Sequence, residues 1–505
     1  MNEIPAANGK GRDEAAGHSP FVAVVDVGSN SVRLVVFSGE GRWPVPVFNE
    51  RTLCGLGRGL AKTGRLDPGG VALALSHLKR FRDLGRAMGV ARWEVVATEA
   101  VRVAKDGKAF VAKAEKCLGV PLKILDGDGE ATASANGVVS GIPGADGLIG
   151  DLGGGSLEIV MLDKGRPGAR ASLPLGPLRF PAKELNDMAA AESRIDNALK
   201  KVPWLKDMAG RGFYPVGGAW RALANVHMGH TDYPLHVIHQ YELGRRDAFD
   251  VLRLVGRMSP QSLGQIPGVS KVRLATLPIA AKIMERLLLR SKPDRVVFSA
   301  HGLREGWLYS ELSKEKRKED PLLAGCAEYG RREARFGAPG TALADWTAPV
   351  FPDDGADWTR LRRAAAYLAE VGWRDHPDYR AEDTFSRILH LPLAGIGHEE
   401  RILLAFMVSA RYGGGRTGLV KRQMRPLIDS DDLAHAITVG RALRLGLSLS
   451  GGTQEILAAT ALAIDKTALT LTLAKGADHM LGDAATRRFE ALARRLGRKP
   501  VVAAG

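Results

Sequence analysis

A pattern of two apolar runs separated by a short polar turn occurs twice along the chain. Phe21 to Val25 is wholly apolar, a polar turn follows, and Val32 to Phe37 is a second β-rich run. This pattern predicts a strand, a tight turn and a strand. The same order returns within Gly147 to Leu162. A repeat at the spacing of a whole domain predicts two related domains facing each other, because a solenoid repeats every ~20 to 50 residues.

The segments between and after these two hairpins alternate between helical and strand patterns, which predicts an α/β fold. From Pro321 the chain becomes rich in Ala, Leu and Arg with helical periodicity at Trp358 to Val371, Glu399 to Tyr412 and Asp432 to Leu445. Thr467 to Leu473 alternates like a strand. We therefore predict a flexible segment at 1–20, α/β domains at 21–142 and 143–312, and a mainly α-helical region at 313–505.

Composition is that of a folded protein. Of 505 residues, 45% are hydrophobic and 25% are charged, which excludes disorder, collagen and coiled coil. The three cysteines, Cys54, Cys117 and Cys326, are too widely spaced for a disulfide framework or a thiolate zinc site. The first twenty residues lack a signal-peptide core, and about 18 consecutive apolar residues occur nowhere. We expect a cytoplasmic protein that does not bind membranes.

The net charge of +15 predicts attraction to a polyanion. Nucleic acid is a poor candidate, because the chain has no zinc finger, helix-turn-helix signature or basic strand interleaved with aromatic residues. We therefore expect no nucleic-acid partner and look for a smaller or simpler polyanion.

Both predicted turns carry residues that can bind phosphate. A turn of Gly, Ser and Asn can direct backbone N–H groups and hydroxyls at a phosphate, while an Asp at the strand end can hold a metal ion. The first loop is Gly28, Ser29, Asn30 and Ser31 after Asp26, and the second loop is Gly153, Gly154, Gly155 and Ser156 after Asp151. Two unrelated hairpins would explain the three consecutive glycines poorly, since glycine weakens a strand.

These loops resemble the phosphate loops of the exopolyphosphatase/guanosine pentaphosphatase (Ppx/GppA) family, and exopolyphosphatase most of all. Further matches are Thr98 to Ala104, Gly127 to Ala131, Gly217-Gly218 and Gly302 to Gly306. Within the second of these, we expect Gly127 to Gly129 to form a loop before Glu130. The resemblance implies two actin-like (ASKHA, ribonuclease H-like) domains flanking a cleft, followed by an HD-like helical module. It also implies hydrolysis of terminal phosphate from inorganic polyphosphate with Mg²⁺ as cofactor.

The resemblance also implies roles for single residues. Glu130 aligns with the family's catalytic glutamate and is assigned the general base, and Glu158 aligns with a second acidic residue that shares this work or holds Mg²⁺. Asp26 and Asp151 would be metal-side carboxylates across the cleft, and Arg102 matches a phosphate-binding arginine. The two loops would bind substrate. Two alternatives remain for Arg33, which either contacts phosphate or pairs with a neighbouring carboxylate. Two also remain for Glu305, which either acts at the site or caps the start of a helix.

The sequence departs from the family pattern at two places. Many members carry two consecutive acidic residues at the catalytic glutamate, whereas here the first is Gly129. The helical module reads Leu368-Ala369-Glu370-Val371-Gly372 where an HD pair is expected, so we predict that it is non-catalytic. Its arginines, including Arg416, could guide a polyanion or form a dimer contact, or lie on a solvated face. The resemblance favours a homodimer.

Three other functions remain open. A guanosine pentaphosphate (pppGpp) phosphohydrolase would use the same site chemistry, and a non-enzymatic sensor of polyphosphate or an alarmone (ppGpp or pppGpp) would use the same loops. An actin-like kinase is less favoured, because no sugar-binding segment with a base aspartate is found.

Overall fold

The computed structural model describes residues 21–39, 41–181, 184–185, 187–337, 339–415 and 418–504. The predicted flexible segment 1–20 and Arg416 lie outside the described residues. The chain divides into two compact units, Met1–Lys318 and Glu319–Gly505. The division falls within the charged run at 314–320, a few residues after the boundary predicted at Leu312. Each unit is described by itself.

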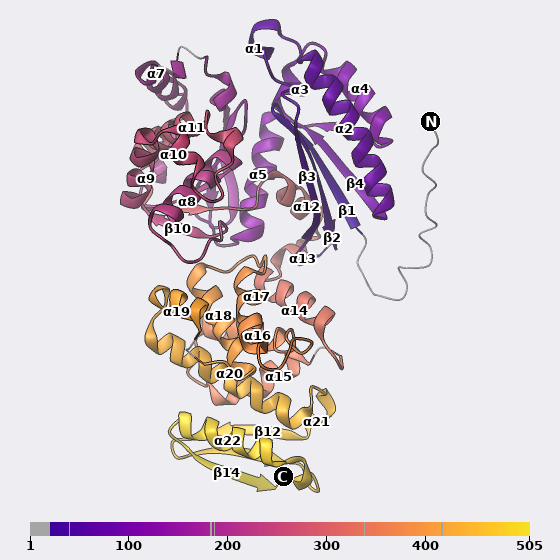
Figure 1. Cartoon of the computed structure of the whole chain (residues 1–505), viewed down its shortest axis with the longest axis vertical. Coiled ribbons are helices and arrows are strands. Elements are labelled where there is room, and N and C mark those ends of the chain that lie inside the picture. The colour runs from indigo at the N-terminus through magenta and orange to yellow at the C-terminus, as the bar shows by residue number, and fades with distance from the viewer. Residues whose placement is uncertain are drawn as a thin grey trace. The chain divides into compact units, whose positions relative to one another are not determined.

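The first sheet of the N-terminal unit has five strands in the order β3-β2-β1-β4-β5, with β1 antiparallel to β2 and parallel to β4. These strands are β1 (Phe21–Val27), β2 (Ser31–Ser38), β3 (Val45–Leu53), β4 (Val90–Ala97) and β5 (Lys123–Ile124). Val22 and Ala23 are both fully buried, so β1 is covered on both faces, as its unbroken apolar run predicts. Figure 1 shows α2 and α4, which share one core with this sheet.

The second sheet repeats this topology. Its order is β10-β11-β9-β6-β7-β8, and β6 is antiparallel to β7 and parallel to β9, as β1 is to β2 and β4. These strands are β6 (Gly147–Leu152), β7 (Leu157–Asp163), β8 (Arg166–Leu173), β9 (Gly212–Val216), β10 (Tyr241–Gly244) and β11 (Arg295–Phe298). The internal repetition seen in the sequence is therefore a repetition of the fold.

Two helices cross between the two sheets. Helix α5 (Gly127–Gly141) follows the first sheet in the chain but packs in the core of the second, through Ala135 and Val138. Helix α12 (Leu303–Glu311) follows the second sheet and returns to the first, where Leu308 packs against Val22. This exchange of helices ties the two α/β domains together.

Glycines allow α5 and α12 to touch. A Cβ atom on Gly306 would lie 1.8 Å from the carbonyl oxygen of Ala133, and one on Gly137 would lie 2.2 Å from that of Gly302. No side chain fits in this space, so the crossing of the two helices depends on these glycines.

The remaining helices of the N-terminal unit cover the sheets or connect them. They are α1 (Leu60–Thr63), α2 (Pro68–Ala87), α3 (Glu99–Val103), α4 (Gly107–Leu118), α7 (Met188–Leu199), α8 (Gly218–His230), α9 (Arg245–Arg257), α10 (Pro260–Gly264), α11 (Leu277–Ser291) and α13 (Lys314–Lys318), with short 3-10 turns η2 (Pro177–Arg179), η3 (Pro203–Met208) and η4 (Lys271–Arg273).

The C-terminal unit is mainly helical, as predicted, and it also contains a three-stranded sheet. Its helices are α14 (Pro321–Glu333), α15 (Gly340–Thr347), α16 (Ala356–Tyr367), α17 (Arg380–His390), α18 (His398–Arg411), α19 (Leu419–Met424), α20 (Ser430–Ser450), α21 (Gln454–Ala458) and α22 (Asp483–Arg495), with 3-10 turns η5 (Ala348–Val350), η6 (Arg425–Leu427) and η7 (Asp478–Met480). The sheet is β12 (Thr460–Ile464), β13 (Ala468–Leu473) and β14 (Lys499–Ala504). Among the described residues of both units, every helix is too short or too polar to cross a membrane.

Candidate active site

The two predicted loops have the same backbone geometry. In the first loop, between β1 and β2, the N–H of Gly28 donates to the carbonyl of Ser31 at 3.0 Å. In the second loop, between β6 and β7, the N–H of Gly153 donates to the carbonyl of Ser156, also at 3.0 Å. Each loop is thus a tight turn between antiparallel strands, as the sequence predicts.

The carbonyl groups of both loops are held by a neighbouring segment. The carbonyl of Ser29 accepts from Gly57 N–H at 2.7 Å, and the carbonyl of Gly154 accepts from Leu178 N–H at 2.9 Å. The N–H groups of Ser29, Asn30, Gly154 and Gly155 donate to no partner in the part of the chain that the structure describes. Backbone donors oriented in this way form a site for an anion such as phosphate.

The two loops also lie against each other. A Cβ atom on Gly155 would lie 3.2 Å from the Ser29 hydroxyl, and one on Gly154 would lie 3.6 Å from the Asn30 Cβ. Residues more than one hundred positions apart in the chain therefore meet at one place. The structure thus brings together the two loops that we predicted to bind substrate.

The strands that flank the loops place acidic residues beside them. Asp151 on β6 is the cross-strand partner of Glu158 on β7, and Asp26 on β1 is the partner of Arg33 on β2. Directly paired residues of antiparallel strands share one face of the sheet. Glu158 therefore occupies in the second domain the position that Arg33 occupies in the first.

Glu130 lies in the first turn of α5, and the Gly127 to Gly129 segment that we expected to be a loop is part of this helix. The helix starts there because the side chain of Asp126 accepts from the N–H of Gly129 at 2.7 Å, which caps it. Only 8% of Glu130 is exposed. The Nη1 of Arg102 lies 3.3 Å from its Oε2.

Burial raises the pKa of Glu130 to about 7, with a further increase from the charge of Asp151 and an opposing effect from Arg102. A carboxylate with such a pKa is half ionised at neutral pH, which suits a general base. The sequence prediction assigned Arg102 to phosphate. In the structure its Nη1 also donates to the carbonyl of Leu125 at 2.5 Å, which holds the guanidinium beside Glu130.

Two further acidic residues of the site, Glu158 and Asp151, are buried and half-buried, respectively. Glu158 is 2% exposed, and burial together with the charge of Glu130 raises its pKa well above the ordinary value. Its Oε1 accepts from the hydroxyl of Ser172 at 2.9 Å. Burial likewise raises the pKa of Asp151, whose Oδ2 accepts from the hydroxyl of Ser134.

Asp26 interacts with the returning helix α12. The Nη1 of Arg304 lies 3.2 Å from its Oδ2, and burial raises its pKa although this arginine and Arg33 oppose the rise. Glu305 caps α12 by accepting from the N–H of Gly302 at 2.9 Å, which supports the capping alternative for this residue. Arg33 donates its Nε to Asn49 at 2.8 Å.

The carboxylates at this site are ligands of the type that Mg²⁺ prefers. Asp26, Asp151, Glu130 and Glu158 are linked through the effects of their charges on one another's pKa, and burial raises the pKa of each, so a cation would relieve an unfavourable concentration of negative charge. Among the described residues, no three His, Cys, Asp or Glu side chains are grouped closely enough to hold a metal by themselves. Mg²⁺ commonly takes one or two carboxylates and completes its shell with water and substrate phosphates.

Family models match both units of the chain. Residues 34–315, more than half of the chain, match the Ppx/GppA phosphatase family. The chain belongs to the Ppx/GppA phosphatase family. Residues 322–502 match a second model, described as exopolyphosphatase, C-terminal. The family resemblance seen in the sequence is therefore confirmed, and the HD-like relationship of the C-terminal unit stays a prediction.

Curated relatives of this Ppx/GppA phosphatase carry two kinds of name. Exopolyphosphatase 2 of Mycobacterium tuberculosis is 28% identical over 311 residues, which cover 56% of this chain and 96% of that protein. Guanosine-5'-triphosphate,3'-diphosphate pyrophosphatase of Vibrio cholerae is 23% identical over 418 residues, which cover 79% of this chain and 82% of that protein.

Solved structures support the actin-like fold. The exopolyphosphatase from Cytophaga hutchinsonii is 22% identical with a TM-score of 0.51, covering 57% of this chain and 97% of that one. The Aquifex aeolicus family member is 24% identical with a TM-score of 0.50, covering 59% of this chain and 98% of that one. At this identity the likeness concerns the fold.

Sequence reasoning missed three side chains that contact the acidic residues. Ser134 lies one helical turn after Glu130 on α5, Ser172 lies on β8, and Arg304 lies on α12. Arg304 stands inside the Gly302 to Gly306 motif, so a signal for it was present. The two serines had none, because serine is common and only the packing of α5 and β8 brings these two to the site.

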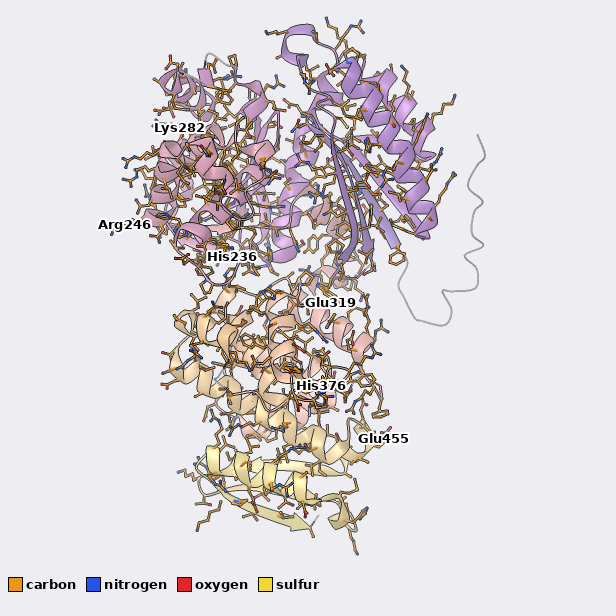
Figure 2. All side chains as sticks on the ribbon, viewed as in Figure 1. His236, Arg246, Lys282, Glu319, His376 and Glu455 are labelled. Carbon is orange, nitrogen blue, oxygen red and sulfur yellow. The ribbon has the colours of Figure 1, made fainter. Side chains whose placement is uncertain are left out.

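In the part of the C-terminal unit that the structure describes, the histidines are not grouped as ligands of a metal ion. Figure 2 labels His376, whose side chain is 65% exposed, and among the described residues no metal-binding group is found. Glu370, at the position expected for an HD pair, instead accepts from Arg335 with a shortest distance of 2.6 Å.

Proposed function

We propose that this protein is an exopolyphosphatase, which hydrolyses terminal phosphate from inorganic polyphosphate. The observation that carries the proposal is Glu130, a buried carboxylate with a pKa of about 7 whose charge interacts with those of Asp26 and Asp151, the residues that lead into two loops whose N–H donors have no partner among the described residues. Removal of a terminal phosphate requires an activated water and a way to neutralise the charge of the transferred phosphoryl group.

The side chains act as follows in this proposal. N–H groups and hydroxyls of the two loops hold the terminal phosphates. Glu130 accepts a proton from a water as the water oxygen bonds to phosphorus, and the bond from phosphorus to the bridging oxygen breaks. The shortened chain leaves with its electron pair and is protonated by solvent. Arg102 increases the ionised fraction of Glu130 at neutral pH, because a nearby cation favours the charged form.

Mg²⁺ would be held by one or two of Asp26, Asp151 and Glu158 together with water and substrate phosphates, and when bound it would neutralise negative charge on the phosphate oxygens. Glu158 keeps a second role here. Its hydrogen bond from Ser172 fixes the carboxyl group next to Glu130, so it helps to position the base.

Positive charge near the first loop favours a polymeric substrate. The Nε of Arg51 donates to the hydroxyl of Ser31 at 3.0 Å. The pKa of Arg273 is lowered by the burial of its guanidinium and by the positive charges of Arg51 and Arg221. Several guanidinium groups are thus close enough to affect one another beside a loop that binds phosphate. Together with the net charge of +15, this arrangement suits a chain of many phosphates better than a single nucleotide.

A pppGpp phosphohydrolase is the second candidate. The Vibrio cholerae relative with that type of name matches 79% of the chain, whereas the exopolyphosphatase relative matches 56%. Both activities break a phosphoanhydride bond at the same loops, so site geometry alone does not separate them.

Phosphate release tests the proposal. The full chain with Mg²⁺ is supplied with long-chain polyphosphate, pppGpp or ATP, and kcat/KM is compared among the three. The proposal expects polyphosphate to be preferred. A preference for pppGpp would support the second candidate, a preference for ATP would support the kinase or ATPase reading, and inactivity with all three would favour a non-enzymatic sensor. The expected homodimer can be measured on the same sample by light scattering.

A further inference from the structure

A carboxylate outside the group described above lies at the junction of the two loops. Glu99 opens helix α3 directly after β4, and it is 8% exposed. A Cβ atom on Gly155 of the second loop would lie 1.7 Å from its Oε2, and the same Cβ would lie 3.2 Å from the hydroxyl of Ser29 in the first loop. The Glu99 carboxylate therefore fills the space beside Gly155.

This position is unfavourable for a substrate anion. The N–H of Gly155 has no partner among the described residues, so it is one of the donors expected to bind phosphate. A negative side chain next to such a donor repels an incoming phosphate, because like charges in a poorly solvated place interact strongly. Glu99 thus occupies space and carries charge where the substrate would bind.

One cation neutralises Glu99. The Nη2 of Arg179 donates to its Oε1, so the pair joins the first domain to the second. Arg179 follows Leu178, whose N–H binds the carbonyl of Gly154, and Arg179 N–H itself donates to Gly176 at 2.9 Å. The backbone that carries Arg179 is therefore fixed beside the second loop, while its guanidinium binds the Glu99 carboxylate.

We propose that Glu99 is a specificity-determining residue that holds Arg179 in place of a substrate phosphate and is displaced when the substrate binds. Arg179 then exchanges its carboxylate partner for phosphate oxygens, which a guanidinium can bind in pairs. This inference rests on the proposed function of the site. Its consequence is selection by charge: an anion must outcompete a carboxylate for Arg179, which a run of adjacent phosphates does better than one phosphate.

Binding of tripolyphosphate tests the exchange without turnover. The full-length protein carrying Glu130→Gln is titrated with tripolyphosphate in a calorimeter, alone and with Glu99→Gln added. The neutral amide removes the repulsion and releases Arg179, so we expect binding to become tighter on the order of tenfold. Glu50→Gln is the matched control: Glu50 also pairs with an arginine, Arg80 at 2.9 Å, but on β3, outside both loops. This control should bind as the parent does.

A second variant keeps the test decisive if Glu99→Gln fails to fold, which circular dichroism would reveal. Arg179→Gln leaves Glu99 without its cation and removes the phosphate ligand, so we expect tripolyphosphate to bind at least tenfold more weakly. In the enzyme with Glu130 intact, Glu99→Gln should lower KM and leave kcat within about twofold, a split that a purely structural role would not produce.

The outcomes separate the two proposals. Equal or weaker binding by Glu99→Gln, or unchanged binding by Arg179→Gln, would overturn the exchange and leave the proposed function standing. Absence of tripolyphosphate binding in every variant would overturn both.

Discussion

Arg102 offers the most direct way to perturb the base. Its Nη1 lies 3.3 Å from Oε2 of Glu130, and it opposes the rise in the pKa of Glu130 that burial causes. Replacing it with glutamine keeps a polar side chain and removes the charge. If Arg102 keeps Glu130 ionised, Arg102→Gln should raise the pKa of Glu130 above 7.

The size of the shift follows from the distance. Two unit charges 3.3 Å apart interact by about 5 kcal/mol at an effective dielectric constant of ~20, which is an upper limit. Arg102 keeps 23% of its side chain exposed, so solvent reduces this value, and neighbouring cations commonly lower a carboxyl pKa by about 1 to 3 units. We expect a rise of about 1 to 2 units, to a pKa of roughly 8 to 9.

The assay is the pH dependence of kcat/KM for polyphosphate hydrolysis in wild type and Arg102→Gln. The ionised fraction of Glu130 at pH 7 falls from about one half to between roughly 1/10 and 1/100, so activity there should fall about 5- to 50-fold and recover as pH rises. An activity loss of the same size at every pH would refute this reasoning. It would show that Arg102 serves substrate binding alone, as the family resemblance implied.

Three further predictions use other parts of the site. Glu130→Gln should unfold at a higher temperature than wild type at pH 8, and the difference should shrink towards pH 5. The pKa of Glu130 in the folded protein, about 7, lies above the ordinary 4.5, so ionisation of Glu130 destabilises the wild type by ~3 kcal/mol as pH rises through this range. A constant difference in melting temperature would contradict this. Gly306→Ala should destabilise the chain by ~3 kcal/mol or more in thermal or urea unfolding, because its Cβ would lie 1.8 Å from the Ala133 carbonyl. Gly256→Ala on α9, with no atom within 4 Å, should instead be neutral or stabilising by up to ~1 kcal/mol, and equal effects of both changes would argue against the helix contact. Ser134→Ala should lower kcat about tenfold with little change in melting temperature, since Asp151 loses a hydrogen bond that favours its ionised form; unchanged kinetics would separate Asp151 from the reaction.

Much of the fold could be predicted from local patterns. The strand from Phe21 and the strand from Leu157 are short apolar runs bounded by turn residues, and both lie in the expected hairpins. The packing of α5 on the second sheet and of α12 on the first could not be predicted. Helix periodicity indicates that one face of a helix is buried, but it does not indicate which sheet covers that face. The structure of Gly127 to Gly129 was also not predicted. Glycines indicated a loop there, but the side chain of Asp126 caps a helix that begins at Gly127.

The residues of the candidate site could be predicted where they belong to a sequence motif. Both loops were found from residue order and Glu130 from the family resemblance, and the family match confirms that resemblance. The roles of Asp26, Asp151 and Glu158 towards Mg²⁺ stay predictions. Contacts made by single residues far apart in the chain, such as Glu99 with Arg179, leave no pattern, because they depend on how two domains meet.

The most direct test of the central claim is phosphate release from long-chain polyphosphate with Mg²⁺ at pH 8, for wild type and Glu130→Gln. A general base contributes about 10²- to 10⁴-fold to a rate, so we predict a loss of that size in kcat for a variant that remains folded. Full activity of Glu130→Gln would contradict the assignment of the base and, with it, the account of the site.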